Sequence, residues 1–186
     1  SEVDRVLKEL DELIRTLEEL NKKVSRENRE LIKEDKKRND EVVKRLEDLI
    51  RELKERVDKL KDKKTLKDML RRMKEEIDKL LKEIRERNEE SLKESDRLLR
   101  EVHKLNRDIK KEIEDLLRDI ERKIKDDKDA LKKVREVIER LKEEVERLDR
   151  ETKKSADEAK EAIKRSLEEV EDVVRKIREK IKKAEE

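Results

Sequence analysis

The chain has 186 residues, of which 61% are charged, and it contains no Gly, Pro, Cys, Trp, Tyr or Phe. This composition excludes disulfide frameworks, thiolate metal sites, glycine-rich phosphate loops and the aromatic stacking used by single-strand nucleic-acid binders. Because 58 basic residues are interleaved with 56 acidic ones, the net charge is only +2, and we expect no nucleic-acid or membrane partner.

The first predicted element is a helix over residues 2–61. Its apolar residues alternate at spacings of three and four, which is the heptad pattern of a coiled-coil seam. Acidic residues precede basic ones by four, as in Glu18–Lys22, and each such pair stabilises a helix by about 0.2–0.5 kcal/mol. The seam comprises Val3, Leu7, Leu10, Ile14, Leu17, Asn21, Val24, Asn28, Leu31, Asp35, Arg38 or Asn39, Val42, Leu46, Leu49, Leu53, Val57 and Leu60.

Two further helices are predicted over residues 65–125 and 129–185, each with its own seam. Where the first seam stops, Thr65 and Asp68 resemble a capping box in which Asp replaces the usual Glu. Where the second seam stops, either Asp127 or Asp129 is a suitable N-cap.

The sequence therefore predicts an all-α fold, a long up-down-up antiparallel three-helix bundle that forms one domain over residues 1–186. The 3.5-residue period predicts left-handed coiled-coil packing, and each helix would be on the order of 90 Å long. An alternative has breaks near residues 38, 90 and 153, which would give six shorter helices. The uninterrupted heptad phase favours three.

Each seam becomes polar or small near its middle, although its ends are strictly aliphatic. Folding the chain at its two short loops groups these residues into two layers, one near residues 21, 106 and 152 and one near residues 39, 88 and 166. In this register Asn21 faces Asn106, and His103 faces Thr152. The predicted core polar network comprises Asn21, Asn28, Asp35, Asn39, Asn88, Ser91, Ser95, His103, Asn106, Thr152, Ser155 and Ser166.

Buried amides that pair across helices fix register and partner choice at some cost in stability. We therefore expect cross-helix hydrogen bonds in the two layers and a small, mixed core around Asn28, Ser95, Ser155 and Ala159. The alternative is that the polar side chains lie at the edge of the core and bond to water.

No catalytic, cofactor or metal site is expected. His103 is the only histidine, and the acidic residue that often precedes a ligand histidine by three is replaced by Arg100. Serine and threonine hydroxyls have only this one base, with no third group to orient it. We therefore expect neither an enzyme nor a cofactor.

The chain resembles computationally designed helical bundles with modular hydrogen-bond network layers. The resemblance rests on the Leu/Ile/Val seams, the Glu/Lys/Arg surfaces, and isolated Asn, Ser, Thr and His at seam positions, in stretches such as 94–99 and 154–159. It implies a fold demonstration, a rigid spacer, or a component of assemblies or switches.

Of three hypotheses about function, the third, an enzyme or a natural spectrin-like rod, is disfavoured because the aromatic residues expected in the cores of such a rod are absent. Two hypotheses remain. The first is a designed structural scaffold, a monomer that requires no partner and has no natural biochemical activity. The alternative is a designed interaction module that forms homo-oligomers through surplus apolar residues. No targeting signal is evident, so the localisation is open. The surplus apolar residues are Val6, Leu13, Leu20, Ile32, Val43, Ile50, Leu81, Leu105 and Leu117.

Overall fold

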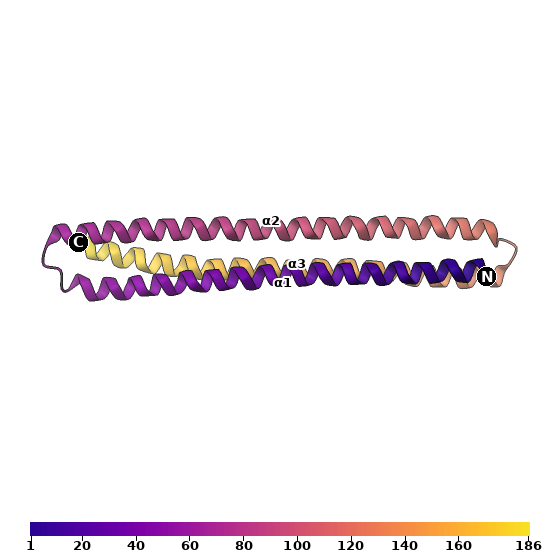
Figure 1. The fold of residues 1–186 in the computed structure, drawn as a ribbon, viewed down its shortest axis with the longest axis horizontal. Coiled ribbons are helices and arrows are strands. Elements are labelled where there is room, and N and C mark those ends of the chain that lie inside the picture. Colours follow the sequence, from indigo (N-terminus) through magenta and orange to yellow (C-terminus); the bar gives the residue numbers. More distant parts are fainter. The chain divides into compact units, whose positions relative to one another are not determined.

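The computed structural model describes all residues from 1 to 186 and contains three α-helices and no strand. These are α1 (Glu2–Val57), α2 (Lys63–Lys123) and α3 (Lys128–Glu185), coloured in chain order in Figure 1. Residues 38, 90 and 153, considered above as possible breaks, lie inside helices. The all-α prediction of three helices is therefore confirmed, and the six-helix alternative is wrong.

The first connection differs from the prediction at both of its ends. Helix α1 ends at Val57, and its last turn is closed by the backbone N–H groups of Lys59 and Leu60, which donate to Arg56 O at 3.1 and 2.9 Å. Helix α2 begins at Lys63 because Asp62 caps it: Asp62 Oδ1 accepts from the Lys64 N–H at 3.1 Å. Position 65 is thus already helical, and the capping box predicted there is wrong.

The second connection is capped at one of the two expected positions. The backbone N–H of Ala130 donates to Asp127 Oδ1 at 3.1 Å, so Asp127 is the N-cap of α3. The N–H of Asp127 itself donates to Ile124 O at 2.9 Å, which closes the turn after α2. Each loop therefore ends in one aspartate that caps the next helix, and neither loop contains a glycine.

Replacing Asp127 by Ala should lower the free energy of unfolding by about 1 kcal/mol, because the first turn of α3 loses its side-chain acceptor. Urea denaturation followed by circular dichroism measures the change. The matched control is Asp126→Ala, since Asp126 is an exposed loop neighbour. Equal losses in the two variants would show that charge, and not the cap, is responsible.

The chain divides into two compact units, each built from a segment of all three helices. Unit 1 comprises residues 1–29 and 95–158, and unit 2 comprises residues 30–94 and 159–186. That the whole chain is a single domain stays a prediction.

Ion pairs within each unit show that consecutive helices are antiparallel. In unit 1, Lys110 contacts Glu146 at 2.5 Å, whereas Glu121, farther along α2, contacts the earlier Arg135 at 3.2 Å. In unit 2, ion pairs join Arg85 to Glu171 and Asp78 to Arg178 in the same descending order. The Arg45–Glu76 pair, at 2.7 Å, joins α1 to α2. The up-down-up order is therefore confirmed within each unit.

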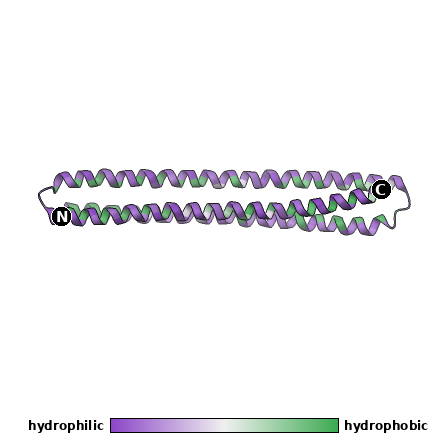
Figure 2. Cartoon of the chain, turned by 180° about the vertical axis from the view of Figure 1, so that it is seen from behind, coloured by the Kyte–Doolittle hydropathy of each residue, from purple (hydrophilic) through white to green (hydrophobic).

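Each unit has an aliphatic core made from the predicted seams. In Figure 2 the hydrophobic residues recur at short intervals along helices that are otherwise hydrophilic. Burying such side chains stabilises a protein by roughly 1.5–3 kcal/mol each. The unit 1 core contains Leu10, Ile14, Leu17, Ile109, Ile113, Ile120, Val134, Ile138, Leu141, Val145 and Leu148. The unit 2 core contains Leu46, Leu49, Leu53, Leu70, Met73, Ile77, Leu81, Ile84, Val170, Val174, Ile177 and Ile181.

Candidate functional site: polar layers in the core

Amide side chains occur only in the core of this protein. The sequence has five asparagines and no glutamine, and all five asparagines are at least 98% buried. Asparagine is a poor helix former and is usually exposed. Its confinement to buried positions indicates that these amides have a role in packing or pairing between helices.

The first layer, in unit 1, consists of Asn21, Asn106 and Thr152. The two amides bond reciprocally: Asn21 Nδ2 donates to Asn106 Oδ1 at 3.0 Å, and Asn106 Nδ2 donates to Asn21 Oδ1 at 3.2 Å. The Thr152 hydroxyl donates to Asn21 Oδ1 at 2.8 Å. Asn21 Nδ2 also donates to the backbone oxygen of Leu17 at 2.8 Å, which fixes the orientation of the amide. Each of the three helices thus supplies one member.

The first layer continues outward to the surface. Asn106 Nδ2 also donates to Asp149 Oδ1 at 2.9 Å, and the carboxylate of Asp149 lies 2.8 Å from His103 Nδ1. The sequence analysis missed Asp149, although the estimated register places it opposite Asn106. The imidazole of His103 is 48% exposed, so its assignment to the core is wrong: it contacts the layer only through Asp149.

The second layer, in unit 2, consists of Asn39, Asn88 and Ser166. Asn39 and Asn88 form a reciprocal amide pair in which both hydrogen bonds are 3.0 Å long. Asn39 Nδ2 also donates to the Ser166 hydroxyl at 2.9 Å. Asn88 Nδ2 donates to the backbone oxygen of Ile84 at 2.7 Å, one turn back, as Asn21 does in the first layer. The two layers therefore share a reciprocal amide pair and one bond to the backbone, but the α3 hydroxyl donates in the first layer and accepts in the second.

Other polar residues that were expected in the network are not joined to these layers. In unit 1, Asn28 and Ser95 are buried, but neither the Asn28 amide nor the Ser95 hydroxyl has a hydrogen-bond partner. Ser155 is half-buried. In unit 2, Ser91 and Asp35 are buried. Neither Asp35 oxygen has a hydrogen-bond partner of good geometry, although the Ser91 hydroxyl is close enough to lower the pKa of Asp35.

Asp35 is the only buried charged residue. Loss of hydration on burial raises the pKa of Asp35 above its ordinary value of 3.8, and the negative charge of Glu34 adds to the increase. The nearby Ser91 hydroxyl, Arg38 and Arg87 oppose the increase and do not cancel it. The closest cation is Arg38, whose Nη1 lies 3.6 Å from Asp35 Oδ1.

The pKa values of two surface carboxylates, those of Glu144 and Glu146, are lowered, which is the opposite of the shift at Asp35. A hydrogen bond from Arg147 lowers the pKa of Glu144, and one from Lys110 lowers the pKa of Glu146. Both groups are at the helix surface, where ion pairs contribute little to stability. Asp35 is therefore distinguished from them by burial.

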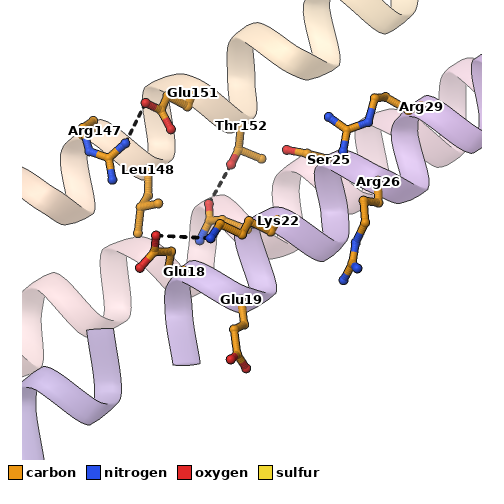
Figure 3. A pocket seen from close by; sticks show the side chains of 11 residues that line it. Glu18, Glu19, Lys22, Ser25, Arg26, Arg29, Arg147, Leu148, Glu151 and Thr152 are labelled. Atoms are coloured by element: carbon orange, nitrogen blue, oxygen red, sulfur yellow. Dashed lines mark hydrogen bonds and ion pairs between the residues drawn. The ribbon is translucent and has the colours of Figure 1, made fainter. Parts of the chain in front are cut away.

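A groove of about 650 Å³ lies beside the first layer and between α1 and α3. Thr152, labelled in Figure 3, donates its hydroxyl to Asn21 Oδ1. The Glu18–Lys22 and Arg147–Glu151 ion pairs, at 3.5 and 2.7 Å, are seen in the same view. The groove is lined by both signs of charge and does not form a one-sign patch. The lining residues are Glu18, Glu19, Asn21, Lys22, Ser25, Arg26, Arg29, Arg147, Leu148, Glu151 and Thr152.

The polar groups of the two layers are joined by hydrogen bonds. The His103–Asp149 pair has the geometry of a base and its orienting carboxylate, but the Thr152 hydroxyl is buried and donates to Asn21. No three His, Cys, Asp or Glu side chains come together in a way that could hold a metal ion. None of the helices contains an apolar stretch long enough to cross a membrane.

No protein-family model matches the sequence, and no curated protein matches it. A similar solved structure is described as a "Computationally designed three helix bundle". It is 22% identical to this chain, the match covers 98% of this chain and 90% of that one, and the TM-score is 0.46. Because this score is low, the fold assignment rests on the helices and contacts described above.

Proposed function

We propose that this protein is a designed structural scaffold in which the two polar layers specify how the helices pair, and that it has no natural biochemical activity. The observation that carries the proposal is the confinement of all five asparagines to the core, four of them in reciprocal pairs between α1 and α2. Uniform aliphatic seams tolerate several registers and partners, whereas a buried amide tolerates only a polar neighbour.

The second layer shows why a shifted register is disfavoured. If α1 and α2 slipped by one turn, the Asn39 amide would face an aliphatic side chain such as Ile84 instead of Asn88. Each polar group left unpaired in the core costs about 1–3 kcal/mol. The observed register is therefore favoured over registers shifted by one turn, because a shifted register leaves buried polar groups unpaired.

The test is to make the second layer aliphatic with Asn39→Leu, Asn88→Leu and Ser166→Ala in one variant. We expect higher thermal stability together with a loss of unique pairing, seen as mixed oligomers by light scattering. The register of α1 against α2 can also be measured by introducing pairs of cysteines and testing which pairs form a disulfide. Because the chain has no cysteine of its own, only the introduced pair can crosslink. Positions 45 and 76 face each other, whereas positions 45 and 72 are one turn out of register.

In the parent protein only the facing cysteine pair should crosslink, and in the aliphatic variant both pairs should. The control is Ile77→Leu with Ile177→Leu, which changes the shape of the unit 2 core without changing its polarity. If the aliphatic variant melts at a higher temperature but keeps one register and one mass, the second layer does not specify pairing. The same result after the first layer is also made aliphatic would overturn the proposal for both layers.

The same mass measurement separates the scaffold from an interaction module. Most of the surplus apolar residues flank a core: Val6, Leu13 and Leu117 pack in unit 1, and Val43 and Ile50 pack in unit 2. Leu81 is itself part of the unit 2 core, and Ile32 is half-buried. Only Leu20 and Leu105 are exposed, at 37% and 41%. These positions support a monomer, and a mass that rises with concentration would favour the interaction module.

A further inference from the structure

A single carboxylate in the core of unit 2 has no role in the layers described above. The side chain of Asp35 is 1% exposed, and neither of its oxygens has a hydrogen-bond partner of good geometry. A buried ionised carboxylate is tolerated when several donors or a close cation compensate for its lost hydration. The Ser91 hydroxyl is the one donor that acts on Asp35.

The charged groups around Asp35 compensate only weakly. On α1, Arg38 is a monodentate contact at 3.6 Å, and its own side chain is 41% exposed, so water screens its charge. Glu34, also on α1, repels a negative charge at Asp35, and Arg87 on α2 attracts it from farther away. On α3, the buried residues at the start of this unit are Ala159 and Ile163, which carry no charge.

We propose that folding of unit 2 takes up one proton at Asp35, so that mild acid stabilises this unit. The proton comes from solvent and binds one carboxylate oxygen, which turns an acceptor-only ion into a neutral group with one donor. The Ser91 hydroxyl, which already acts on Asp35 from α2, is the acceptor for that donor. The polar core of unit 2 then contains amide, hydroxyl and carboxylic acid groups and no buried ion.

The sign of the pH effect follows from linkage. The pKa of Asp35 is higher in the folded state than its ordinary value of 3.8. At pH values between the two, the folded chain therefore keeps a proton that the unfolded chain has lost. The contribution to stability is fully present below the ordinary value and is lost as the pH rises through the folded value. Surface carboxylates such as Glu144, whose pKa is lowered, contribute in the opposite sense, so the Asp35 effect must be isolated by a variant.

The direct test is carboxyl ¹³C NMR of the intact chain labelled at aspartate, titrated from about pH 3 to pH 8, a range that brackets ordinary and raised values. We expect the Asp35 resonance, assigned by its absence in Asp35→Asn, to titrate at a higher pH than the ordinary aspartate value of 3.8. An Asp35 midpoint at or below that ordinary value would overturn the proposal, and this readout needs only the parent protein to be folded.

The second test is urea unfolding of the parent and of Asp35→Asn across the same pH range. Asn is neutral and isosteric, so the variant should be more stable than the parent near pH 7, and its advantage should shrink as the pH falls. Within the titration window the ratio of the two unfolding constants should change by up to about tenfold per pH unit, as one proton requires. Asp40→Asn should show no such trend, and a pH-independent ratio for Asp35→Asn would contradict the proposal.

Discussion

Replacing Asn21 by Ala should cost about 3 kcal/mol of unfolding free energy, the largest loss expected for any single polar position. Asn21 takes part in both bonds of the amide pair with Asn106 and accepts from Thr152. The variant leaves these partners with unpaired atoms and opens a cavity, and each of these changes costs free energy. Urea unfolding monitored by circular dichroism measures the loss.

The matched control is Asn28→Ala, on the same helix and in the same unit. Asn28 is as deeply buried as Asn21, but its amide has no hydrogen-bond partner. Asn28→Ala deletes the same volume without breaking a hydrogen bond. Comparing the two variants therefore separates the cost of the cavity from the cost of the lost hydrogen bonds. If the two variants lose equal stability, the first layer contributes only volume to the core.

Replacing Asn28 by Leu should raise the unfolding free energy by about 2 kcal/mol. The substitution removes two buried polar atoms that lack partners, and the penalty for such groups is about 1–3 kcal/mol. It also adds aliphatic surface to the core of unit 1, because Leu has a size and branching similar to Asn. The expected signature is a higher urea midpoint with an unchanged slope.

The control for this gain is the same substitution at Asn39. That residue is also buried on α1, but it bonds to Asn88 and Ser166, so Asn39→Leu leaves both partners unpaired and should destabilise the protein. A loss of stability in Asn28→Leu would contradict the prediction and would indicate that its amide is satisfied by a group such as a buried water molecule.

Much of the pairing could be worked out from the sequence because heptad spacing and short loops restrict the geometry. The register estimated from the loop centres places Asn21 opposite Asn106 and Asn39 opposite Asn88, and the structure has hydrogen bonds between the same residues. In an antiparallel helix pair the main free parameter is the axial offset, and a short loop restricts that offset to a few residues.

Other features depend on angles and distances that the heptad pattern does not specify. His103 and Asn106 are three residues apart on α2, yet only Asn106 is buried, because a rotation of the helix by part of a turn decides which of them faces the core. Asp62 caps α2 because the chain leaves Val57 earlier than the seam suggests. Both outcomes follow from packing between helices.

The sequence by itself determined three helices, their antiparallel order and most of the residues on each seam, since these depend on periodicity and on where it stops. It also placed the bonded amide pairs opposite each other. Tertiary structure alone decided which of the other buried polar groups lack partners. Hydrogen bonds require donor and acceptor within a few tenths of an ångström of about 2.9 Å, whereas a seam position fixes a side chain only to within a turn. The buried Asn28 amide therefore has no partner, although Asn21 on the same helix is fully bonded.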